Sequence, residues 1–151
     1  MTMIRTAALL VALSLPIAAQ AQPTGFEDCE NAWAAQLQNL TIGENGEGIR
    51  TYYDGAVTLL QIDTIEPAAG SAGIIVMMWT GSDLSDINRL CWITAGHGGI
   101  DVDATESNYD PAEGLTLSVP TSRHSHEDGS LIEGAIRFRL NVDAGTLTPL
   151  F

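Results

Sequence analysis

The sequence predicts an α+β domain in which one N-terminal amphipathic helix packs on a mainly antiparallel β-sheet of five to seven strands, with one disulfide. Three observations lead to this fold class. Between Phe26 and Leu40, apolar residues recur at spacings of three and four, the period of one helix face. The chain after residue 43 consists of short β-rich runs separated by turn dipeptides such as Asn-Gly and Asp-Gly. Only two cysteines are present, and an even number favours pairing.

Residues 1–21 contain the three parts of a secretory signal peptide in order. A positive charge at Arg5 precedes an apolar run over residues 7–19, and Ala19-Gln20-Ala21 fits a cleavage site. This run is shorter than the roughly 20 residues that span a bilayer, and the longest later apolar run, Gly73–Trp79, has only seven. We therefore expect cleavage after residue 21, no membrane insertion, and a single domain over residues 22–151. A short, alanine-rich signal is typical of bacteria, so the expected location is the periplasm or the medium.

The N-terminal helix is expected from Phe26 to Leu40. Thr24 and Glu27 fit a capping box at its start, and Gly43 follows its end. Cys29 lies on the predicted buried stripe, whereas Cys91 lies in a run typical of a strand. A Cys29–Cys91 disulfide would therefore join the helix to the sheet in an oxidising compartment. The predicted buried stripe consists of Phe26, Cys29, Trp33, Leu37 and Leu40.

The first predicted strands form a hairpin and a central strand. Ile49–Tyr53 and Ala56–Glu66 flank Asp54-Gly55, a dipeptide that tolerates the positive φ of tight hairpin turns. The run Gly73–Trp79 is apolar on both faces, which predicts a strand covered on both sides.

Later in the chain, apolar and polar residues alternate over residues 136–142, which predicts a half-buried strand with its arginines on the open face. Leu115–Val119 repeats this pattern more weakly. By contrast, Gly96–Gly114 is polar and poorly periodic. We expect a long loop there, and long loops inside compact domains are often functional.

Two sets of side chains are candidate metal ligands. His97, His124 and His126 all fall in predicted loops, and together with a carboxylate they would suit zinc or copper. Asp101 and Asp103 begin a run of alternating oxygen side chains that would suit calcium. This run lacks the sixth-position glycine and twelfth-position glutamate of a helical-hand calcium loop. Solvated loop residues are the ordinary alternative for both sets.

Charge limits the class of partner. The formal net charge is −13, and it becomes −14 when the signal segment, with one arginine and no acid, is removed. This excess disfavours nucleic acid and anionic lipid, and it favours a cationic protein or small ligand. Arg123, Arg137 and Arg139 could bind a carboxylate or phosphate, although pairing with neighbouring acids is the ordinary explanation.

The sequence favours a binding protein over an enzyme, because it contains no nucleophile elbow, phosphate loop, dinucleotide fingerprint or His-Glu-x-x-His motif. The leading hypothesis is a small exported acidic binding or accessory protein. One alternative is a metal-binding protein that uses His97, His124 and His126 for zinc or copper carriage, or less readily for hydrolysis. The other is a structural envelope protein, which would have a surface without a cleft.

Overall fold

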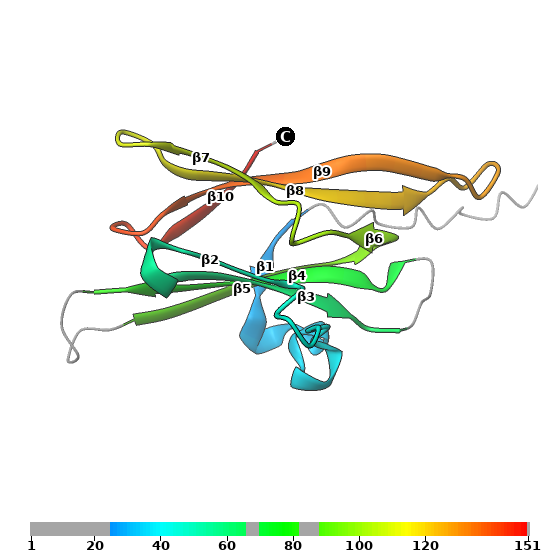
Figure 1. Cartoon of the computed structure of the whole chain (residues 1–151), viewed down its shortest axis with the longest axis horizontal. Helices are drawn as coiled ribbons and strands as arrows, with labels where there is room; N and C mark the ends of the chain where they lie inside the picture. The colour runs from blue at the N-terminus through cyan, green and yellow to red at the C-terminus, as the bar shows by residue number, and fades with distance from the viewer. Residues whose placement is uncertain (1–24, 66–69, 82–87, 151) are drawn as a thin grey trace, which may run out of the picture.

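The computed structural model describes residues 25–65, 70–81 and 88–150, and these form two antiparallel β-sheets that face one another (Figure 1). The predicted signal peptide lies outside the described residues. In the first sheet the strand order is β1 (Glu27–Asp28), β5 (Asn88–His97), β4 (Ala72–Thr80), β3 (Val57–Asp63) and β2 (Ile49–Tyr52). In the second sheet the order is β10 (Thr146–Leu150), β9 (Leu131–Asn141), β8 (Gly114–His124) and β6 (Gly99–Ile100), with β7 (Glu106–Asp110) also paired to β8.

The main hydrophobic core lies between the sheets. Strands β8 and β9 alternate buried and more accessible side chains where they line it, as expected for a two-layer sandwich, whereas β4 is buried on both faces. Phe138 and Leu140 of β9 are fully buried and meet β3 and β4 of the first sheet across the core. The buried members of this core are Val57, Leu59, Ile74, Val76, Met78, Val102, Leu115, Leu117, Val119, Phe138 and Leu140.

The predicted α+β fold is wrong, because the expected helix over residues 26–40 is absent and the described residues contain no helix of seven or more residues. The segment instead forms β1 followed by three short 3₁₀ turns, η1 (Cys29–Asn31), η2 (Trp33–Ala35) and η3 (Leu37–Asn39). Nor is there one sheet of five to seven strands; the described strands form two sheets of five.

The apolar residues of this segment serve two different cores, which explains the wrong prediction. The Phe26 ring packs edge-to-face against Phe138 in the inter-sheet core, with 4.9 Å between ring centroids. The chain then crosses the edge of the first sheet, where β1 pairs with β5, and Ala32 and Ala34 pack on the outer face of that sheet. Cys29 and Leu40 of the predicted stripe pack against the same outer cluster, so they lie on the opposite face of the sheet from Phe26, which no single helix stripe could achieve.

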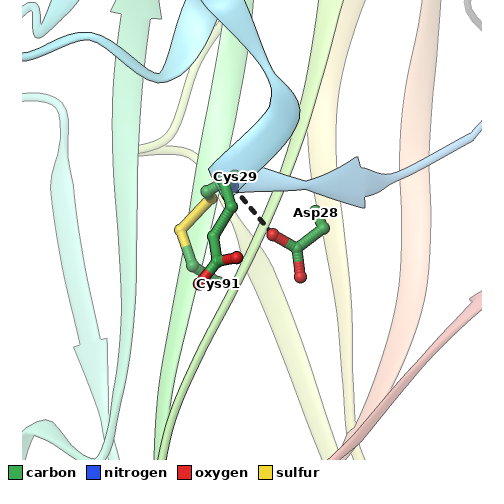
Figure 2. Close-up of a disulfide and its surroundings, with 4 residues drawn as sticks. Asp28, Cys29 and Cys91 are labelled. Atoms are coloured by element: carbon green, nitrogen blue, oxygen red, sulfur yellow. Dashed lines mark hydrogen bonds between the residues drawn. A yellow bond between two sulfur atoms is a disulfide. The ribbon is translucent and has the colours of Figure 1, made fainter.

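The predicted Cys29–Cys91 disulfide is confirmed, with 5.5 Å between the two Cα atoms (Figure 2). It joins η1 to β5. Asp28 caps η1, because its Oδ1 accepts a hydrogen bond of 2.8 Å from the Glu30 N–H. The disulfide therefore fixes the N-terminal segment to the first sheet, and its presence is compatible with an oxidising, exported location.

Three strand predictions are confirmed. The hairpin is formed by β2 and β3, which pair from Ile49↔Leu60 to Tyr52↔Val57. Strand β4 lies in the middle of the first sheet and is covered on both faces. Strands β8 and β9 alternate as expected, with Phe138 and Leu140 buried and Arg137 exposed.

The predicted long loop over Gly96–Gly114 is wrong, because β6 and β7 both lie within it and pair with β8. All five residues of β7 are exposed. A strand without a buried face has no apolar alternation, so the pattern that identifies strands was absent here. Within residues 25–65, 70–81 and 88–150, no helix is long and apolar enough to cross a membrane.

Candidate functional site

A pocket of about 250 Å³ opens between the two sheets. Its walls come from β5 of the first sheet, from β8, β9 and β10 of the second, and from the residues before β1. Most of the lining is apolar. The side chains that decide its chemistry are Phe26, Thr94, His97, Thr121, Ile136 and Pro149.

An irregularity in β5 brings His97 to the pocket. Gly73 pairs with Ala95, yet Ala72 pairs with His97, so one extra residue, Gly96, is inserted in β5. Gly96 has a φ of 92°, which favours glycine. Without the insertion, strand alternation would place His97 on the outer face of the sheet; with it, His97 lies on the same face as Thr94.

The polar side chains inside the pocket are neutral, because Arg137, the one charged residue in the lining, is exposed and strand alternation places its side chain on the other face of β9 from Ile136. Burial lowers the pKa of His97 below its ordinary value of 6.5, so the imidazole is uncharged at neutral pH. Its Nε2 lies 3.3 Å from Oγ1 of Thr94, a buried side chain. Thr121 is already engaged, because its hydroxyl donates a 2.8 Å hydrogen bond to the Gly99 carbonyl. The pocket therefore offers an apolar space with one neutral hydrogen-bonding pair, Thr94 and His97.

The three histidines occupy different settings. His97 lies at the end of β5, His124 is the last residue of β8, and His126 is exposed in the following turn. His124 Nδ1 lies 3.4 Å from the Gly129 carbonyl oxygen, within its own turn. In the described part of the chain, no group of three or more His, Cys, Asp or Glu side chains is arranged to hold a metal ion. The structure thus does not assemble the zinc or copper site that the sequence allowed.

The acidic run also has structural contacts. Asp101 Oδ1 accepts a hydrogen bond from the Ala104 N–H at 3.0 Å, which closes the turn between β6 and β7. Asp103 Oδ2 accepts one from the Gly48 N–H at 3.0 Å, and the Asp103 carbonyl accepts one from Arg50 at 2.9 Å. Asp103 therefore ties this turn to the start of β2. Both carboxylates proposed as calcium ligands thus accept hydrogen bonds from backbone N–H groups.

The three candidate arginines do not share one surface. On β8 and β9, Arg137 and Arg139 pair opposite Ser118 and Thr116, whereas Arg123 pairs opposite Ile132. Strand alternation places Arg123 on the other face from Arg137 and Arg139. Arg139 forms an ion pair of 2.7 Å with Glu113, and only Arg137 borders the pocket. An anion-binding fork made by all three is therefore not formed.

Sequence reasoning identified His97 and Arg137 but missed Thr94, Thr121 and Ile136. Their convergence depends on how the two sheets face each other, which no local pattern encodes. The one available signal was the glycine-rich run at residues 96–99, which marks the irregular end of β5. Comparison with known proteins gives no matching family model, no matching curated protein and no matching solved structure.

Proposed function

We propose that this chain is an exported binding or accessory protein that holds a small, neutral, largely apolar molecule in the pocket between its sheets. The observation that carries the proposal is that the pocket has apolar walls and one hydrogen-bonding pair of side chains, Thr94 and His97. Binding sites typically combine an apolar lining with a few polar groups that orient the ligand. A pocket also favours binding over a purely structural role in the envelope.

The size and charge of the pocket narrow the ligand class. A volume of about 250 Å³ lies just below the range of drug-sized sites, and engineered cavities of roughly 150 Å³ accept benzene. Among the described residues no carboxylate lines the pocket, His97 is neutral, and the charged side chain of Arg137 lies on the exposed face of β9. The expected ligand is thus a molecule of one or two rings, or a short aliphatic chain, with one hydrogen-bonding group.

The proposed location is the bacterial periplasm or the medium. The signal-like segment over residues 1–21 and the Cys29–Cys91 bond both support export. Mass spectrometry of the chain recovered from a periplasmic extract tests this part. A start at Gln22 and a mass two hydrogens below that of the reduced chain are expected, whereas an uncleaved or reduced chain would contradict export.

An NMR screen of the ¹⁵N-labelled oxidised chain tests the pocket. The panel contains indole, phenol and cyclohexanol, each neutral with one hydrogen-bonding group. Binding in the pocket should shift the amide signals of Thr94, His97, Thr121 and Ile136 in a saturable way. Shifts confined to other residues, or none with any member of the panel, would contradict the proposed ligand class.

A further inference from the structure

A pair of exposed tyrosines lies at the other end of the sandwich from His97. Figure 1 shows the β2–β3, β7–β8 and β9–β10 turns gathered at this end. Tyr53 follows β2 in the first sheet, and Tyr109 lies in β7 of the second. Their ring centroids are 5.9 Å apart at an interplanar angle of 82°, an edge-to-face contact. Tyr53 and Tyr109 are 43% and 58% exposed, so the pair presents aromatic surface to solvent.

The backbone of the β2–β3 turn holds Tyr53 outside the core. Tyr52, the residue before it, packs against the inter-sheet core. Tyr53 and Asp54 then adopt φ angles of 52° and 54°, in the left-handed region that a bulky residue rarely enters. This turn, η4 (Tyr53–Gly55), directs the chain into β3. Tyr53 is thereby left to contact Tyr109 across the two sheets.

The surroundings of the pair are negatively charged. Asp54 is exposed beside Tyr53, and Asp143 lies in the β9–β10 turn, also exposed. Burial first, and then the neighbouring Tyr109 and Asp143, raise the pKa of the Tyr53 hydroxyl. The β9–β10 turn, which holds Asp143, lies at the same end of the sandwich as the β2–β3 turn that begins with Tyr53 (Figure 1). Two arginines toward this end already have partners: Arg139 forms an ion pair with Glu113, and Arg89 lies over the Trp79 ring, 4.6 Å from its centroid.

We propose that Tyr53, Tyr109 and Asp143 form a docking surface for a lysine or arginine side chain of a basic partner protein. The face of a tyrosine ring attracts a cation, and an adjacent carboxylate adds charge attraction. The chain itself has no lysine and a net charge of −13, so the whole molecule attracts such a partner. This surface is separate from the pocket and does not depend on its ligand.

A trilysine peptide with blocked ends is the test probe, titrated into the ¹⁵N-labelled oxidised chain at low salt and at about 0.15 M salt. Saturable shifts at Tyr53, Tyr109 and Asp143 are expected, with weaker affinity at the higher salt. Tyr109→Leu should weaken binding about three-fold, whereas Tyr109→Phe, which keeps the ring, should retain it. Spectra that are unchanged away from residue 109 show that the variants fold.

The charge component has a matched control. Asp143→Asn and Glu133→Gln each remove one negative charge, but Glu133 lies toward the other end of β9, in register with Ser122. Asp143→Asn should weaken trilysine binding more than Glu133→Gln does. Equal effects of the two variants, or equal affinity of Tyr109→Leu and the unchanged chain, would overturn the proposal. Binding of a neutral oligosaccharide at the tyrosines with no trilysine binding would overturn the cationic assignment.

Discussion

Reducing the Cys29–Cys91 disulfide should destabilise the whole sandwich. The bond closes a loop with a sequence separation of 62 residues. In the chain-entropy account, a loop of this length restricts the unfolded chain enough to stabilise the fold by about 4 kcal/mol. The reduced N-terminal segment would be held by a two-residue strand, three short 3₁₀ turns and a few buried side chains. Short 3₁₀ turns have little stability of their own.

The assay is urea unfolding of the same chain, oxidised and reduced, so that no side chain changes. With an m-value of about 2 kcal/mol/M, the midpoint should fall by about 2 M on reduction. The effect is global because Phe26 belongs to the inter-sheet core, while Ala32 and Ala34 belong to the outer cluster. Loss of the segment therefore exposes both cores.

The result that would refute this reasoning is a midpoint shift below about 0.5 M with unchanged cooperativity. It would mean that residues 25–40 detach without unfolding the sandwich. The Cys29→Ala/Cys91→Ala double variant is the companion measurement. Its midpoint should match that of the reduced chain, because thiol chemistry contributes nothing to the predicted loss.

Three further predictions concern single residues. Tyr52 Oη is buried without a hydrogen-bond partner among the described residues. Tyr52→Phe should therefore leave the free energy of unfolding unchanged or raise it by up to about 1 kcal/mol. A clear loss of stability in this variant would show that the hydroxyl has a partner. Because burial lowers the folded-state pKa of His97 below 6.5, the unfolded chain protonates first on acidification. Stability should therefore fall as the pH drops from about 6.5 through the folded-state pKa, and a His97→Gln chain with the same pH profile would contradict this. A Cβ at residue 73 would lie 2.5 Å from the Thr94 carbonyl oxygen and 2.9 Å from the Ala95 Cα. Gly73→Ala should therefore cost about 1–3 kcal/mol in urea unfolding, whereas an unchanged midpoint would show that β4 and β5 can separate.

The elements that sequence reasoning predicted correctly are those with one environment on each face. Residues 136–142 alternate because one side of β9 meets the core and the other meets solvent. The pairing of Cys29 with Cys91 followed from the presence of only two cysteines. In the first case the alternation has one cause, burial of one face of the strand, and in the second the number of cysteines allows one pairing.

The elements that it predicted wrongly lack this correspondence. Of the apolar residues at helical spacing, Phe26 packs in the inter-sheet core, whereas Cys29 and Leu40 pack on the opposite face of the first sheet. Strand β7 has no buried face, so its sequence shows no alternation of apolar and polar residues. The pocket is harder still, because Thr94 and Ile136 lie on different sheets and meet only after both have folded. Such contacts are properties of the tertiary structure.

The pocket claim is tested most directly by filling the pocket and measuring affinity. Ile136 lines the pocket, while Ile132 lies four residues earlier on the same face of β9, is 39% exposed and lies outside the lining. Calorimetry would compare Ile136→Trp and Ile132→Trp with the tightest-binding member of the indole, phenol and cyclohexanol panel. We expect Ile136→Trp to weaken binding at least about ten-fold, or about 1.4 kcal/mol, and Ile132→Trp to leave it unchanged. Equal affinities for the two variants would place the ligand elsewhere and contradict the proposed function.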